Sequence, residues 1–71
     1  MKITYKKLWK LLIDHNMKKG ELGKLAKMSP NTIAKLSKNE TVSLEILLRV
    51  CEVFQCDIGD IMEVVPDEEA E

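Results

Sequence analysis

The dipeptide Ser29-Pro30 constrains the fold most, because it marks a helix start in the middle of a largely helical sequence. Serine is a preferred N-cap residue, and proline is favoured at the first helical position, where its missing N–H costs no hydrogen bond. We therefore expect a helix to begin at Pro30, to direct Ile33 and Leu36 inward, and to end near Ser37–Asn39.

Apolar residues recur at helical spacing through most of the chain, and only three glycines and two prolines interrupt them. The other expected helices run from Tyr5 to about His15, from about Lys19 to Lys27, from Leu44 to about Gln55 and from Ile58 to about Met62. Their expected N-caps include Thr4, Ser43 and Asp57, and Asn16 is a suitable residue for a left-handed stop. Leu22, Leu25 and Ala26 form the inner face of the helix expected at 19–27, and the apolar residues at helical spacing in the others include Leu12, Leu44, Leu47 and Leu48. The pattern predicts an all-α, compact five-helix bundle.

Two short segments near the chain ends depart from this helical pattern. Ile3 and Glu63-Val64-Val65 can form short terminal β segments. These segments can pair as a ribbon within one chain or across a dimer, or remain unpaired. We expect residues 1–65 to form one domain and the acidic segment 66–71 to be a mobile tail.

Length and motif content exclude several classes of function. A chain of 71 residues accommodates one small domain, and no apolar run approaches the roughly 18 residues of a membrane helix. The N-terminus lacks a secretory signal pattern, so we expect a cytoplasmic protein without membrane contact. Cys51 and Cys56 do not have zinc-site spacing, and His15 has no partner for acid–base chemistry. We therefore expect no enzyme activity, no catalytic residues, no cofactor and no metal.

The charge is distributed unevenly along the sequence. The formal net charge is −1, but residues 1–38 hold ten lysines against two acids, whereas residues 39–71 hold ten acids against one arginine. A strongly basic segment favours an anionic partner such as nucleic acid.

The helices expected at 19–27 and from Pro30 are joined by about three residues, which is the helix-turn-helix arrangement. We expect Gly23 to lie where these helices approach closely and to require a tiny side chain. The segments Met17–Gly23, Met28–Leu36, Ser43–Cys51 and Cys56–Ile58 resemble the Cro/CI-type (XRE) helix-turn-helix family of small bacterial and phage regulators, over about Leu8–Ile61. This resemblance implies a lambda-repressor-like bundle that binds double-stranded DNA sequence-specifically and regulates transcription.

The sequence departs from the family pattern at four places, one of which is Gly23, where alanine is usual. Lys27 stands where glycine is typical, so a left-handed turn there would cost about 1 kcal/mol of strain. Lys18-Lys19 replaces the usual Thr-Gln pair, which favours phosphate contact over base reading at Lys19. Leu12 replaces the usual arginine and makes the first helix unusually apolar.

The expected DNA-contacting residues lie on and around the helix that begins at Pro30. Asparagine can bond adenine, threonine can contact the thymine methyl and lysine can reach guanine. The candidate base-contacting residues are Ser29, Asn31, Thr32 and Lys35, with Ser29 more suited to capping. The candidate phosphate-contacting residues are Lys18, Lys19, Lys38, Asn39 and Thr41.

We expect a homodimer at an inverted-repeat operator, with half-sites about one helical turn, roughly 34 Å, apart. Repression by promoter occlusion is favoured over activation, because the sequence shows no effector or activation domain. An alternative of another class is a protein–protein module, such as an antitoxin-like or adaptor bundle. The candidate dimer or partner surface is Trp9, Leu12, Ile13, Val64 and Val65.

Overall fold

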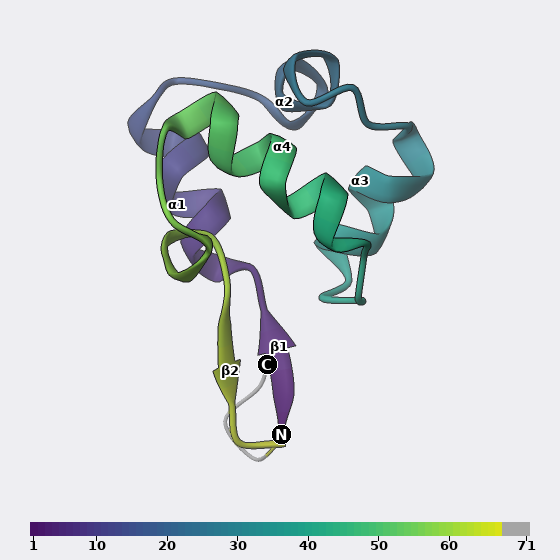
Figure 1. The fold of residues 1–71 in the computed structure, drawn as a ribbon, viewed down its shortest axis with the longest axis vertical. Coiled ribbons are helices and arrows are strands. Elements are labelled where there is room, and N and C mark those ends of the chain that lie inside the picture. The colour runs from purple at the N-terminus through teal and green to yellow at the C-terminus, as the bar shows by residue number, and fades with distance from the viewer. Residues whose placement is uncertain (68–71) are drawn as a thin grey trace.

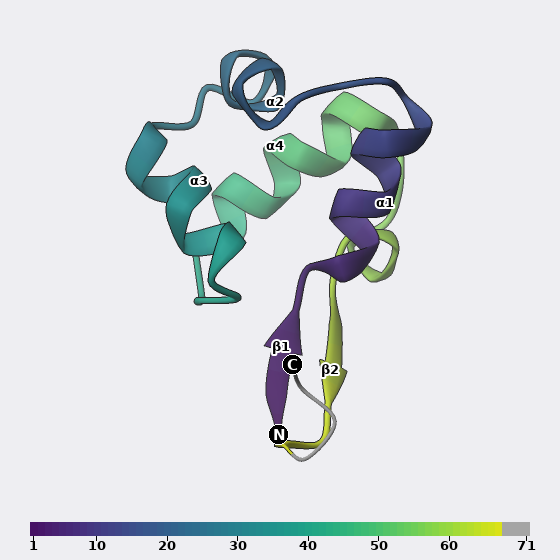
Figure 2. The same ribbon diagram turned by 180° about the vertical axis from the view of Figure 1, so that it is seen from behind.

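Four α-helices and a two-stranded antiparallel ribbon make up residues 1–67, the part of the chain that the computed structural model describes (Figure 1). In chain order the elements are β1 (Lys2–Thr4), α1 (Lys6–Asp14), α2 (Lys19–Leu25), α3 (Pro30–Ser37), α4 (Leu44–Phe54), a 3-10 helix (Ile58–Asp60) and β2 (Glu63–Val65). In both views α4 lies between α1 and α3, and the ribbon projects from the α1 side of the helical body (Figures 1 and 2). The structure is therefore mostly helical, as the sequence pattern predicts.

The expected fifth α-helix is a single 3-10 turn. Asp57 caps it as predicted, because its Oδ1 accepts a hydrogen bond from the Ile58 N–H at 2.7 Å. The helix does not continue to Met62, because the following residues, Glu63–Val65, pair with β1. The bundle thus has four α-helices within residues 1–67, and the five-helix prediction is wrong in this respect.

The ribbon forms within one chain. Its register places Lys2 opposite Val65, Ile3 opposite Val64 and Thr4 opposite Glu63. Of the acidic segment 66–71, Pro66 and Asp67 are exposed, and the Asp67 carboxylate lies 3.2 Å from the N-terminal amine. The rest of the expected mobile tail lies outside the described residues.

Two further N-caps are predicted correctly, and the predicted start of α1 is one residue too early. The Ser29 and Ser43 hydroxyls accept hydrogen bonds from the N–H groups of Thr32 and Ile46, each at 3.3 Å. Tyr5 occupies the N-cap position of α1, while the predicted cap, Thr4, accepts the N–H of Lys6 through its Oγ1 at 3.3 Å. The Tyr5 N–H donates to Asn39 Oδ1, so a distant residue supplies a bond at this helix start.

Each of the four α-helices is followed by a residue with positive φ. These residues are Asn16 at 57°, Lys27 at 56°, Asn39 at 60° and Gln55 at 52°. The left-handed stop at Asn16 and the strained conformation of Lys27 are confirmed, and both positions end a helix where the C-terminal carbonyls need new partners.

The core draws one or more residues from each of the four α-helices, from the β1–α1 junction and from the residue after the 3-10 helix. Its buried members are Tyr5, Leu8, Leu12, Leu22, Ala26, Leu36, Leu47, Val50 and Ile61. Leu25, which the pattern places on the inner face of α2, is more than half exposed, and so are Leu44 and Leu48, which lie at helical spacing on α4. Apolar spacing therefore identifies the four α-helices and overestimates how much of α2 and α4 is covered.

Gly23 is buried between α2 and α3, as expected, but the space around it is larger than expected. A Cβ at this position would lie 3.5 Å from both Ile33 Cδ1 and the Met28 carbonyl, which is ordinary van der Waals contact. The expectation that only a tiny residue fits is therefore wrong for a single added methyl group.

None of the helices in residues 1–67 has the length and apolar character needed to cross a membrane.

Candidate nucleic-acid interface

The pair α2–α3 forms the helix-turn-helix unit. Residues 26–29 join the two helices, and the Met28 N–H closes the end of α2 by donating to the Gly23 carbonyl at 2.7 Å. Leu36 is fully buried and holds α3 against the core. The opposite side of α3 is exposed at Asn31, Ala34 and Lys35. This face is available to a ligand outside the protein.

The four candidate base-contacting residues fall into two groups. Asn31 and Lys35 are exposed and lie one helical turn apart on α3. Ser29 and Thr32 are engaged with each other, because their hydroxyl oxygens lie 3.2 Å apart and Ser29 also caps the helix. The structure therefore brings Asn31 and Lys35 together on one face, and it gives Ser29 the capping role that the sequence favours.

The candidate phosphate-contacting residues also differ in their surroundings. Lys18, Lys38 and Thr41 are exposed around the ends of α2 and α3. Lys19 Nζ donates to Ser37 Oγ at 3.0 Å and lies 4.4 Å from the centroid of a Trp9 ring. A lysine ammonium has three donors, so the bond to Ser37 leaves two of them for another acceptor.

The loop after α3 is tied to the β1–α1 junction. Asn39 Oδ1 accepts the Tyr5 N–H at 3.1 Å, and the Tyr5 hydroxyl donates to the Glu40 carbonyl at 2.8 Å. Burial raises the pKa of the Tyr5 hydroxyl above its ordinary value, because the charged phenolate is poorly solvated there. Sequence reasoning missed Tyr5, since it joins segments that lie far apart along the chain.

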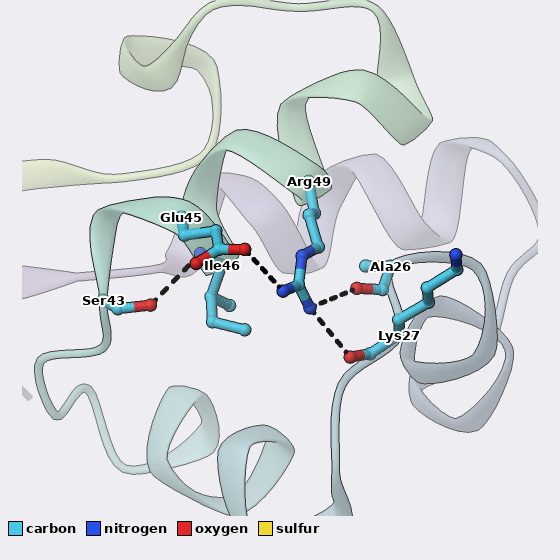
Figure 3. Close-up of polar contacts among 6 residues, drawn as sticks. All are labelled: Ala26, Lys27, Ser43, Glu45, Ile46 and Arg49. Carbon is cyan, nitrogen blue, oxygen red and sulfur yellow. Dashed lines mark hydrogen bonds and ion pairs between the residues drawn. The ribbon is translucent and has the colours of Figure 1, made fainter.

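Arg49 is a second residue that sequence reasoning missed. Its Nη1 donates to the Lys27 carbonyl at 3.0 Å and lies 3.5 Å from the Ala26 carbonyl, while Nη2 pairs with Glu45 Oε2 at 2.8 Å (Figure 3). The available signal was that this residue is the one base among residues 39–71, in an otherwise acidic segment. It connects α4 directly to the turn of the helix-turn-helix unit.

The candidate dimer or partner surface is not continuous. Leu12 is 4% exposed and belongs to the core, so its placement on that surface is wrong. Trp9 and Val65 are half-buried, whereas Ile13 and Val64 are largely exposed. Ile13 lies near the end of α1, and Val64 lies in the ribbon beyond the start of α1 (Figure 1). The separation of these residues weakens the protein–protein alternative.

Comparison with known proteins agrees with this geometry. A sequence model of the Cro/C1-type HTH DNA-binding domain matches residues 7–67. The crystal structure of the transcriptional regulator VanUg (form II) is 56% identical in sequence, with a TM-score of 0.89; the match covers 93% of this chain and 88% of that one. No curated protein matches the chain.

Proposed function

The chain belongs to the Cro/C1-type helix-turn-helix DNA-binding family, and from this premise we propose that it regulates transcription by binding a specific duplex sequence with α3 in the major groove. The observation that carries the proposal is the exposed pair Asn31 and Lys35 on a helix whose opposite side is fixed in the core. The similar structure is that of a transcriptional regulator, which supports the regulatory role.

Each proposed base-contacting residue on or beside α3 has a defined chemical task. Asn31 can bond the N6 and N7 positions of adenine, and Lys35 can donate to O6 and N7 of guanine. Thr32 can contact a thymine methyl group, and Ser29 fixes the helix start from which the readers project. Ala34 leaves room for close approach to the groove.

In this proposal, residues on either side of α3 contact the phosphate backbone of the duplex. Lys18, Lys38 and Thr41 provide exposed donors, and Lys19 retains donors beyond the one bonded to Ser37. Asn39 uses its carbonyl oxygen within the fold, so its amide nitrogen can serve as a donor to phosphate. These contacts set the register of α3 on the duplex without reading sequence.

The proposed regulator acts as a homodimer of its 1–65 domain on an inverted repeat, with half-sites about 34 Å apart. One domain of this size offers few base contacts, and two readers on one site multiply the specificity. Occupancy of a promoter by such a dimer blocks access to it, so repression follows from binding alone.

Selection of bound sites from a random pool of duplexes tests the proposal. The expected result is a palindromic motif that binds two protomers, measured as the mass of the complex. A pool without enrichment would overturn sequence-specific binding, and one protomer per motif would overturn the homodimer.

Two alanine variants then test the residue assignments on the selected duplex. Asn31→Ala should cost about 1–3 kcal/mol on the selected sequence and relax the preference at one base position. Lys18→Ala should weaken binding to all sequences alike, because phosphates are the same in every duplex. An equal, sequence-independent loss in both variants would show that Asn31 is not a base reader.

A further inference from the structure

Two backbone carbonyls of the turn between α2 and α3, those of Ala26 and Lys27, accept hydrogen bonds from a side chain of α4. The Met28 N–H closes the helix on the Gly23 carbonyl, and Lys27 turns the chain with φ 56°. Ala26 and Lys27 lie within the segment closed by this bond, and their carbonyls face Arg49 of α4 (Figure 3). Carbonyls at a helix C-terminus carry partial negative charge and attract a cationic donor.

Arg49 supplies that donor in a fixed orientation. One side of its guanidinium is held by Glu45 at 2.8 Å, and the other side reaches the Lys27 and Ala26 carbonyls. The donors of a guanidinium lie in one rigid plane, so the ion pair with Glu45 aims the opposite edge at the turn. About a third of the Arg49 side chain is exposed, at 34%, so water screens the contact only in part.

The element that carries Arg49 is itself well fixed. Leu47 and Val50, which flank Arg49 on α4, are buried in the core. The guanidinium therefore connects a rigid helix to a turn whose lysine adopts a conformation that glycine would accept more readily.

We propose that Arg49 is a positioning residue for DNA recognition, which acts by clamping the α2–α3 turn to α4 and thereby setting the direction in which α3 begins. The inference rests on the proposed function of α3. Ser29 caps α3 two residues after Lys27, so a displaced turn displaces Asn31 relative to the groove. Base contacts require hydrogen-bond geometry, whereas the long-range attraction to phosphates tolerates a shift. Loss of the clamp therefore acts mainly on the specific complex.

The test compares Arg49→Met and Arg49→Lys with the wild-type chain on the selected duplex and on an unrelated duplex. Arg49→Met keeps a long side chain and removes every donor, and Arg49→Lys keeps the charge but not the planar fork. In both variants the affinity for the selected duplex should fall about tenfold, and the affinity for the unrelated duplex less than about twofold. Amide hydrogen exchange in the free protein should accelerate at Met28, whose N–H is bonded to the Gly23 carbonyl.

Two control variants separate positioning from charge and from stability. Lys10→Met removes one exposed positive charge from α1, and Val53→Ala truncates a half-buried side chain on α4. Both should keep the ratio of specific to unspecific affinity, even where Val53→Ala lowers the unfolding midpoint as much as Arg49→Met does. All affinities are measured at a temperature well below the thermal unfolding midpoint of each variant, where circular dichroism shows that the variant is folded.

The outcomes distinguish this proposal from the proposed function. If the wild-type chain does not prefer the selected duplex, the proposed function fails and the positioning role fails with it. If the wild type is selective and the ratio is unchanged in both Arg49 variants, only the positioning role is overturned. If the ratio of specific to unspecific affinity falls as much in Val53→Ala as in the Arg49 variants, the effect of Arg49 is general stabilisation, and the proposal is overturned.

Discussion

At the turn between α2 and α3, a lysine occupies a backbone conformation that glycine adopts without strain. Lys27 has φ 56°, and the β-carbon of an L-residue is crowded there. Asn16 has nearly the same φ, 57°, but asparagine tolerates the left-handed region better than most residues. The two positions therefore differ in strain although their backbones are alike.

This difference predicts the effect of Lys27→Gly. Relief of strain should raise the free energy of unfolding by about 1 kcal/mol, partly offset because glycine is freer in the unfolded chain. For a domain of this size, that corresponds to a rise in Tm of up to about 4–8 °C in thermal unfolding.

Asn16→Gly is the matched control for this prediction, since the same backbone conformation is already tolerated there. The rise in the free energy of unfolding should be clearly smaller for Asn16→Gly than for Lys27→Gly. Equal gains at both positions, or a loss at Lys27, would show that the lysine stores no strain.

At the scale of elements, Tyr5 joins the start of α1 to the loop that follows α3. Its hydroxyl donates a hydrogen bond to the Glu40 carbonyl, and its backbone N–H donates one to Asn39 Oδ1. These bonds hold Lys38 and Thr41, two proposed phosphate contacts, in a loop with defined ends. The same burial raises the pKa of the Tyr5 hydroxyl, so ionisation opposes folding.

The raised pKa predicts a loss of stability in alkaline solution. The contribution of neutral Tyr5 is fully present below the ordinary tyrosine pKa of about 10 and declines as the pH rises from there toward the higher pKa of the folded state. Urea unfolding at increasing pH should show a steeper fall for the wild-type chain than for Tyr5→Phe. At neutral pH, Tyr5→Phe should be about 1 kcal/mol less stable, because the Glu40 carbonyl loses its donor.

Tyr5 is the one tyrosine in the sequence, so tyrosinate absorbance follows its ionisation directly. Cys51 and Cys56 also have pKa values raised by burial, but both are present in the two variants and their contributions cancel in the comparison. Parallel stability curves for wild type and Tyr5→Phe would contradict the prediction.

At the scale of the whole molecule, the charge separates between the first three helices and the remainder. The ten lysines all precede residue 39, and ten of the twelve acids follow residue 38. The helix-turn-helix unit therefore lies in the basic part of a chain whose net charge is −1. Long-range attraction to a polyanion depends on this distribution rather than on the total.

The arrangement predicts steep salt dependence of DNA binding. If Lys18, Lys19 and Lys38 of each protomer in a dimer contact phosphate, the slope of log affinity against log salt should be about −5. Lys38→Ala should reduce the magnitude of this slope by about 2, because each dimer loses two contacts. Fluorescence anisotropy titrations over a range of salt concentrations measure both slopes.

Lys10→Ala serves as the control for the salt experiment, since Lys10 lies on α1 outside the proposed contacts. Its slope should match that of the wild-type chain. A slope near zero for the wild type would contradict the phosphate assignments as a group.

The sequence alone determined the features that depend on neighbouring residues. Ser29-Pro30 and Ser43 set helix starts through hydrogen bonds to residues three positions further along, and Asn16 set a left-handed stop. The helix-turn-helix arrangement and the position of Asn31 near the start of α3, where its side chain is exposed, followed from these local signals and from helical periodicity.

Only the tertiary structure decided the features that depend on distant partners. Periodicity marks the apolar residues of a helix but not which of them other elements cover. Leu44 and Leu48 of α4 are exposed, whereas Leu12 of α1 is buried. Pairing of β1 with β2 limits the last helix to one turn, and Tyr5 and Arg49 meet their acceptors across the fold. These contacts join segments far apart in the chain, and their geometry is defined only once the core has brought those segments together.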